Sequence, residues 1–155
     1  MSETMAVTNF WNEFQLKYHP TTANYSIRAF VDFSSKLATE LAELAVAGTK
    51  TATANSYDFY QFHQKPLPVV GNYDIVLDGK GNPRGIIEIT AVDIIPFGEV
   101  TEEFAYLEGE GDRTLRFWRE LHESFFKSQM KEIGKGFDYD LPVICEQFRL
   151  VYSRG

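Results

Sequence analysis

A hairpin signal in the middle of the chain constrains the fold more than any other feature of the sequence. Apolar and polar residues alternate from Gly71 to Leu77, which indicates a β-strand. The turn-forming run Asp-Gly-Lys-Gly-Asn-Pro follows at 78–83, and Arg84 to Phe97 reads as a long, bent second strand rich in Ile and Val. The chain must therefore build a sheet around this antiparallel pair.

Helical patterns lie on both sides of the hairpin. Apolar residues recur at helical spacing in three segments, and Thr101 is expected to cap a short further helix that ends near Gly109. Ser34 or Ser35 is the expected N-cap of the second helix, and Asp112 is that of the last. The three longer helices are predicted at 4–18, 36–47 and 113–131.

Two more strands complete the expected sheet, one starting at Thr51 and one over residues 144–152. Residues 21–33 and 55–69 are expected to be irregular connections. Strands that are interrupted by helices predict an α+β domain. A small mixed sheet of five or six strands, with helices beside it, is expected to curl toward a barrel.

Composition narrows the class of protein. A chain of 155 residues suits one domain, so we expect a single domain over 1–155, with residues 1–35 as an N-terminal helical extension packed on it. The formal net charge of −7 excludes a generally basic nucleic-acid coat, though not a local basic groove, and DNA is not an expected partner. Cys145 is the single cysteine, which excludes an internal disulfide and predicts a buried, inert thiol.

The sequence carries no membrane or export signal that we recognise. No run of about 18 apolar residues occurs, which is the length that a membrane-spanning helix needs. The first residues lack the basic segment and apolar core of a signal peptide. We therefore expect a cytoplasmic protein without a membrane partner.

The stretch from Gly48 to Ala54 is the first candidate for a functional site. Its side chains are small apart from Lys50, so another molecule can approach the backbone. Lys50 is open to three roles: a solvated charge, a phosphate-binding charge, or a base whose pKa is lowered by burial. Thr53 is either a nucleophile with a base beside it or an ordinary strand former. Positions 50 and 53 of a regular strand point to opposite faces, so they share a site only if the strand begins after Lys50 or bends there.

The acidic segment around Gly109 is the second candidate. Glu108 ends a predicted helix, where the helix dipole disfavours a carboxylate, so it needs a partner such as a lysine. Glu110 is either part of that pairing or a surface residue. His122 lies on an apolar helix face, as a hydrogen-bonded core histidine or as a ligand or base. Glu146 shares an apolar strand face and must be paired or neutral; its candidate partners are Arg84, Arg113 and Lys50.

Six short motifs follow one another along the chain, and the resemblance to a known family rests on them. They are Gly48–Thr53 (GTKTAT), Pro68–Tyr73 (PVVGNY), Leu77–Pro83 (LDGKGNP), Pro96–Ala105 (PFGEVTEEFA), Glu108–Asp112 (EGEGD) and Cys145–Phe148 (CEQF). From about residue 36 to the C-terminus the chain resembles the larger bacterial ASCH-domain proteins. The resemblance implies one ASCH domain, a β-barrel of the PUA-like superfamily with flanking helices, and a cleft for RNA or a modified nucleoside.

The resemblance also implies an activity. Small ASCH enzymes that resemble this chain hydrolyse N4-acetylcytidine with a Lys, a Thr three residues later and a Glu after the next hairpin. By motif position these are Lys50 as the activating base, Thr53 as the nucleophile and Glu108 as the group that orients the lysine. The small enzymes carry Ile-Arg after the threonine, where this chain has Ala54-Asn55. They also lack the N-terminal helix and the connection at 55–69, which is rich in aromatic residues. We expect no cofactor and no metal for this chemistry.

Two functions compete on these residues. The first is an amidohydrolase that acts on an N4-acylated cytidine or a similar modified nucleoside. The alternative is an RNA-binding module or metal-dependent ribonuclease, in which Lys50, Lys65, Arg84 and Arg113 line a groove and Tyr57, Tyr60 or Phe62 stacks on bases. A ligand sensor without chemistry uses the same cleft. The candidate substrate-binding residues are Thr51, Asn55, Tyr57, Arg84, Glu110, Asp112 and Arg113. The oligomeric state stays open.

Overall fold

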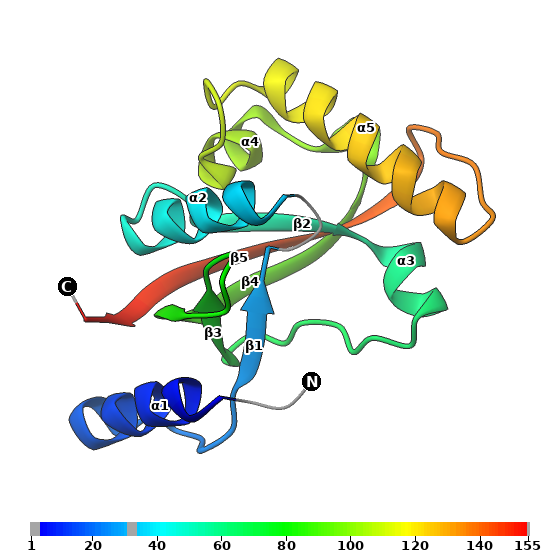
Figure 1. Cartoon of the computed structure of the whole chain (residues 1–155). Coiled ribbons are helices and arrows are strands. Elements are labelled where there is room, and N and C mark those ends of the chain that lie inside the picture. Colours follow the sequence, from blue (N-terminus) through cyan, green and yellow to red (C-terminus); the bar gives the residue numbers. More distant parts are fainter. Residues whose placement is uncertain (1–3, 31–33, 155) are drawn as a thin grey trace.

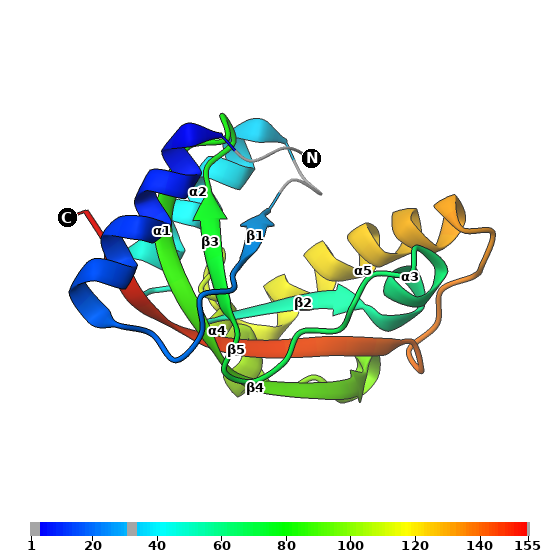
Figure 2. The ribbon, with the colours of Figure 1, turned by 90° about the horizontal axis from the view of Figure 1, so that it is seen from below.

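The computed structural model describes residues 4–30 and 34–154. The five strands found there form one mixed sheet in the order β1-β3-β4-β5-β2, in which β1 runs parallel to β3 and the other neighbours are antiparallel. The sheet curls, as Figures 1 and 2 show from two sides. The expected α+β class with a small curved sheet is confirmed. The strands are β1 (Ser26–Ala29), β2 (Ala52–Ser56), β3 (Tyr73–Leu77), β4 (Pro83–Pro96) and β5 (Pro142–Ser153).

The α-helices in the described part of the chain each begin after a serine or threonine whose hydroxyl accepts a backbone N–H. The expected caps Ser34 and Thr101 are confirmed. The cap predicted at Asp112 is wrong, because the chain takes a left-handed turn at Arg113 (φ 65°) and Thr114 caps the last helix instead. The helices are α1 (Met5–Tyr18), α2 (Ser35–Val46), α3 (Tyr57–Phe62), α4 (Glu102–Glu108) and α5 (Leu115–Glu132), with a 3₁₀ turn η1 at Phe97–Glu99.

The long strand β4 is the central strand of the sheet. It forms the predicted hairpin with β3 and pairs with β5 from Gly85 to Pro96. The register with β5 shifts between Ile86 and Ile87 and again between Ile89 and Ala91. Such irregularities bend a strand and increase its twist, which explains why two long strands curl instead of forming a flat ribbon.

Three groups of buried side chains hold the helices on the sheet. α1 packs through Phe10 and Trp11 on the face of β3 that carries Ile75, whereas α2 packs through Leu41 on the face that carries Val76. Neighbouring residues of a strand point to opposite faces, so these two helices lie on opposite sides of the sheet. α4 and α5 form the third group over β2 and one end of β5 (Figure 2). Within the described ranges, no helix combines the length and apolar character needed to cross a membrane.

Two segments that were expected to be irregular contain regular structure. The segment at 21–33 includes β1, and the one at 55–69 begins with the end of β2 and continues as α3; residues 31–33 lie outside the described ranges. Cys145 is buried, as predicted, and burial raises the pKa of its thiol to about 12.

Candidate active site

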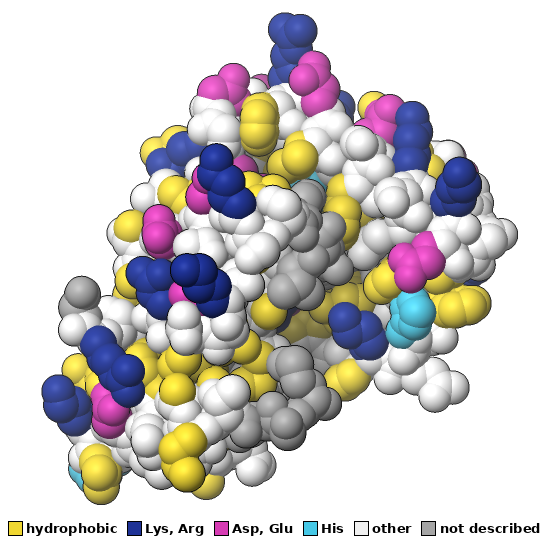
Figure 3. Space-filling view, viewed as in Figure 1, with side chains coloured by type: hydrophobic (Ala, Val, Ile, Leu, Met, Phe, Trp, Pro, Cys, Tyr) yellow, Lys and Arg dark blue, Asp and Glu magenta, His cyan; other side chains and the backbone are white. Residues whose placement is uncertain are grey.

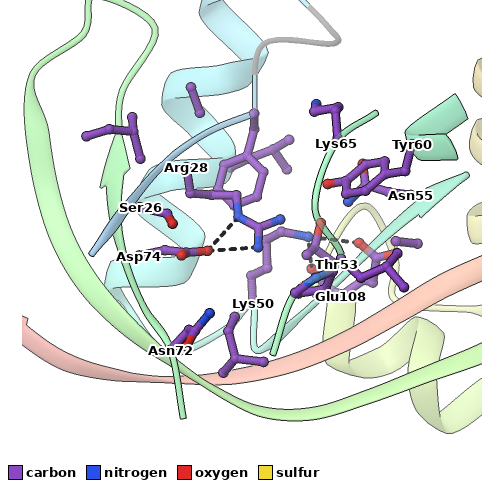
Figure 4. Close-up of a pocket in the computed structure, with 18 of the residues that line it drawn as sticks. Ser26, Arg28, Lys50, Thr53, Asn55, Tyr60, Lys65, Asn72, Asp74 and Glu108 are labelled. Atoms are coloured by element: carbon purple, nitrogen blue, oxygen red, sulfur yellow. Dashed lines mark hydrogen bonds and ion pairs between the residues drawn. The ribbon is translucent and has the colours of Figure 1, made fainter. Parts of the chain in front are cut away.

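A cavity of about 370 Å³ opens on the concave side of the sheet. The space-filling view shows it as a hollow near the middle of one face (Figure 3). β1 and β3 form one wall, and β2 with the end of α4 and the middle of α5 forms the other. The close-up in Figure 4 shows Lys50, Thr53 and Glu108 together on one side, with Arg28 and Asp74 toward the other. The cavity therefore collects charged residues from segments far apart in the sequence.

The backbone before β2 brings Lys50 and Thr53 to the same cavity. Gly48 takes a left-handed conformation (φ 80°), and the N–H of Lys50 donates to the Leu44 carbonyl at 3.0 Å, so Lys50 is still bonded to the last turn of α2 although it lies beyond the helix. The strand itself starts at Ala52. Because Lys50 precedes the regular strand, the two-residue alternation does not separate it from Thr53, and both side chains line the cavity.

The Lys50 ammonium is enclosed by oxygen atoms. Its Nζ donates to Glu108 Oε1 at 2.8 Å, to Glu110 Oε2 at 3.1 Å and to the Glu108 carbonyl at 3.4 Å. The side chain is only 1% exposed, and the Phe30 ring lies 5.4 Å away. Burial alone would lower the pKa of Lys50, but the two carboxylates outweigh it and raise that pKa above its ordinary value.

Glycine at position 109 lets two carboxylates reach one lysine. Gly109 ends α4 in a left-handed conformation (φ 74°), and a Cβ there would lie 2.6 Å from the Thr49 carbonyl oxygen. Only glycine permits this close approach without strain. Glu108 on the last turn of α4 and Glu110 just beyond it therefore both face Lys50.

Glu108 has the most complete set of partners in the cluster. Its Oε2 accepts from Trp118 Nε1 at 2.6 Å and lies 3.3 Å from His122 Nε2. The other ring nitrogen of His122 lies 2.9 Å from the Trp118 carbonyl oxygen. Both ring nitrogens thus face acceptors, which favours the doubly protonated imidazolium.

The pKa values of the cluster follow from these contacts. Burial lowers the pKa of His122, but Glu108 outweighs it and the net shift is upward. Burial would raise the pKa of Glu108, yet Lys50 and then His122 hold it well below its usual range. For Glu110, burial is the largest influence, and its pKa is raised despite Lys50.

A second charged cluster joins three strands, with Arg28 from β1, Asp74 from β3 and Glu146 from β5. Arg28 Nε donates to Asp74 at 3.0 Å, and Nη1 donates to Glu146 at 3.1 Å. Glu146 is fully buried, so the expectation that it is paired is confirmed, but none of the three predicted partners is the right one. Arg28 was missed because β1 lies in a segment that carries no alternating pattern.

The other predicted site residues divide between the cavity and the outside. Asn55 and Glu110 line the cavity, as Tyr60 and Lys65 also do. Five predicted binding residues lie outside its lining: Thr51, Tyr57, Arg84, Asp112 and Arg113.

Three of these outlying residues have other partners. Arg84 lies near Glu43 and Asp78 at the far end of β4, and Arg113 stacks on the Tyr106 ring at 3.6 Å. Asp112 accepts from the Thr114 hydroxyl at 2.6 Å. None of these three side chains lines the cavity.

A metal ion fits this cluster poorly. Glu108, Glu110 and His122 offer donor atoms within 4.8 Å of one another among the described residues. The Lys50 ammonium already contacts both carboxylates, and both histidine nitrogens face acceptors. A divalent cation would have to displace Lys50, so we assign no metal here.

Comparisons with known proteins agree with this architecture. The family model of the ASCH domain matches residues 28–152. A crystal structure of an ASCH domain from Lactobacillus crispatus JV V101 is 29% identical, with a TM-score of 0.88 over 98% of each chain. A crystal structure of a protein from Enterococcus faecalis V583 is 38% identical, with a TM-score of 0.86 over 94% of this chain and 88% of that one. The comparison with curated proteins gave no match. The chain therefore belongs to the ASCH domain family and has its PUA-like α+β fold.

Proposed function

We propose that this protein hydrolyses the amide bond of an N4-acylated cytidine or a similar acylated nucleoside. The observation that carries the proposal is the meeting of Lys50, Thr53 and Glu108 at one cavity. The Thr53 hydroxyl makes no hydrogen bond within the described part of the chain, although the residue is only 7% exposed. A buried hydroxyl that faces a cavity and lacks a protein partner is available to a ligand.

The charges of the cavity favour an uncharged ligand over a phosphate. Arg28 is engaged by Asp74 and Glu146, and Lys50 is engaged by Glu108 and Glu110. Each buried cation thus faces two carboxylates, and neither has positive charge to spare for a phosphate group. A cavity of about 370 Å³ is within the usual range for small-molecule sites. These properties support a free nucleoside as the substrate.

In the proposed reaction Thr53 Oγ attacks the acyl carbon, and the carbon–nitrogen bond breaks. Cytidine leaves with its amino group restored, and the acyl group stays on Thr53 as an ester. Water then attacks the ester, releases the carboxylic acid and returns the threonine hydroxyl. Lys50 is held in place by Glu108. Its longest hydrogen bond, at 3.4 Å to the Glu108 carbonyl, is the one that it exchanges for a bond to the oxyanion formed in each step.

The test is turnover of a panel of N4-acylated cytidines, with N4-acetylcytidine first, followed by chromatography for cytidine and the free acid. We expect Thr53→Ala to abolish turnover and Thr53→Ser to retain part of it, since serine keeps the hydroxyl. Thr90→Ala is the matched control, because Thr90 is an exposed threonine of β4 outside the cavity lining. No turnover by the unmodified protein on any member of the panel would refute the proposal.

RNA binding at the rim of the same cavity is the second candidate. The ASCH domain is a PUA-like fold often proposed to bind RNA. One local observation favours it here: the exposed Lys65 lies 4.8 Å from the centre of the Tyr60 ring, and both residues line the cavity. A cation over an aromatic ring in a cavity lining suits a single strand of RNA, whose bases stack on such rings. Binding of single-stranded RNA that weakens with salt and with Lys65→Gln would support this function, and absent or salt-independent binding would exclude it.

A further inference from the structure

The hydrogen bonds of Lys50 require an ammonium group and do not suit a neutral amine. An ammonium group has three N–H donors, and each of the three acceptors around Nζ takes one of them. A neutral amine would offer two donors and turn its lone pair toward an oxygen atom. Losing the proton would also remove two ion pairs inside a buried site. Lys50 is therefore suited to remain positively charged rather than to accept a proton.

Glu108 is equally unsuited to carry a proton. Both of its carboxylate oxygens accept from the surrounding donors Lys50, Trp118 and His122. Each of these contacts stabilises the ionised form, which holds the pKa of Glu108 far below its ordinary value. Its side chain is 2% exposed and has no oxygen left without a donor.

Glu110 differs from Glu108 in all these respects. Lys50 donates to its Oε2, and its carboxyl group also lies within hydrogen-bond reach of Glu108. The residue lines the cavity with 10% of its side chain exposed. The charged groups that face it are Lys50 from the segment before β2, Glu108 from α4 and His122 from α5. Burial and the nearby Glu108 raise its pKa, so its proton exchanges closer to neutral pH than that of an ordinary glutamate.

We propose that Glu110 is the proton carrier of this site, while Lys50 stays an ammonium that stabilises the oxyanion. The inference rests on the proposed amide hydrolysis. As Thr53 Oγ bonds to the acyl carbon, its proton passes to the Glu110 carboxylate, directly or through one water. When the carbon–nitrogen bond breaks, Glu110 gives this proton to the departing nitrogen. In the second half it takes a proton from the attacking water and returns it to Thr53 Oγ, so that amide and water become amine and carboxylic acid.

The experiment is the pH profile of kcat/KM for N4-acetylcytidine hydrolysis. A carboxylate base predicts a rise through an apparent pKa above 4.5, the ordinary value for this group, and then a plateau into the alkaline range. Glu110→Gln should lower kcat by about 10²–10⁴-fold and remove the acidic limb. Glu110→Asp should restore part of the rate together with the limb. Glu102→Gln, at an exposed glutamate of α4, is the control that should leave both unchanged.

The outcomes separate this inference from the proposed function. Two results would overturn the role of Glu110 and leave the hydrolysis by Thr53 intact. One is a kcat/KM that keeps rising beyond about pH 10, and the other is an acidic limb that persists in Glu110→Gln. If no substrate is turned over, the proposed function fails, and NMR of protein with labelled lysine and glutamate still tests the charge assignment. Lys50 found neutral at about pH 8, or Glu110 titrating below its ordinary value, would overturn the inference.

Discussion

Replacement of Lys50 by methionine tests the electrostatics of the site without reference to any substrate. Methionine keeps the length and apolar stem of the side chain but removes the charge between Glu108 and Glu110. Glu108 is then left 1% exposed with a carboxylate that has lost its shortest ion pair. Removing one partner of a buried pair costs about 3–5 kcal/mol in the free energy of unfolding. For a chain of this size that corresponds to a decrease in Tm of about 6–20 °C.

The pH dependence of this loss has a definite sign. Without Lys50 the pKa values of Glu108 and Glu110 in the folded state rise, since the cation that lowered both is gone. A carboxyl group whose folded pKa lies above its unfolded value stabilises the fold below about pH 4.5 and loses that contribution as pH rises. The free energy of unfolding that Lys50→Met loses relative to the unmodified protein should therefore be larger at about pH 8 than at about pH 5.

Urea denaturation followed by far-UV circular dichroism at several pH values measures this difference. Lys135→Met is the matched control, because Lys135 is an exposed lysine for which the described residues show no ion pair. We expect a change within about 0.5 kcal/mol for that variant. If Lys50→Met loses less than about 1 kcal/mol of unfolding free energy, or if its loss does not vary with pH, the assignment of Lys50 as a buried, doubly paired cation is refuted.

Two further predictions address the neighbours of Lys50. Gly109→Ala should cost more than about 2 kcal/mol of unfolding free energy, whereas Gly81→Ala should cost only about 1 kcal/mol: both glycines have positive φ, but only at Gly109 would a Cβ meet the Thr49 carbonyl. Equal losses in the two variants would show that the close approach is unimportant. His122 has a raised folded pKa, because Glu108 outweighs burial, so its contribution is complete below about pH 6.5 and disappears as pH rises through the folded value. Unfolding free energies measured from about pH 6 to pH 9 should fall more steeply for the unmodified protein than for His122→Gln, and parallel curves would contradict this.

The parts of the fold that the sequence predicted are those with strong local signals. The β3–β4 hairpin has alternation, a run of turn residues and a second strand, all within one continuous segment. The partner of Glu108 was also accessible to simple reasoning, since a carboxylate at a helix C-terminus requires a cation, and the structure supplies Lys50. Local chemistry was sufficient in both cases.

The parts that were missed depend on contacts between distant segments. β1 has four residues and no alternating pattern, and its parallel pairing with β3 joins Ser26 to Asp74 across the chain. α3 has six residues, too few for a helical period to stand out. The displaced start of α5 depends on the left-handed conformation of Arg113, which is unusual for a residue other than glycine.

The position of β1 changes how the N-terminal segment relates to the site. Glu146 is completely buried beside Arg28, and Arg28 has no other ion pair than those with Glu146 and Asp74 among the described residues. A buried carboxylate without its cation is strongly unfavourable, so the sheet can bury Glu146 in its ionised form only when β1 is in place. The same strand supplies one wall of the cavity through residues 26–29. Assembly of the cavity and neutralisation of a core carboxylate therefore depend on one arginine, which couples the stability of the sheet edge to the integrity of the candidate active site.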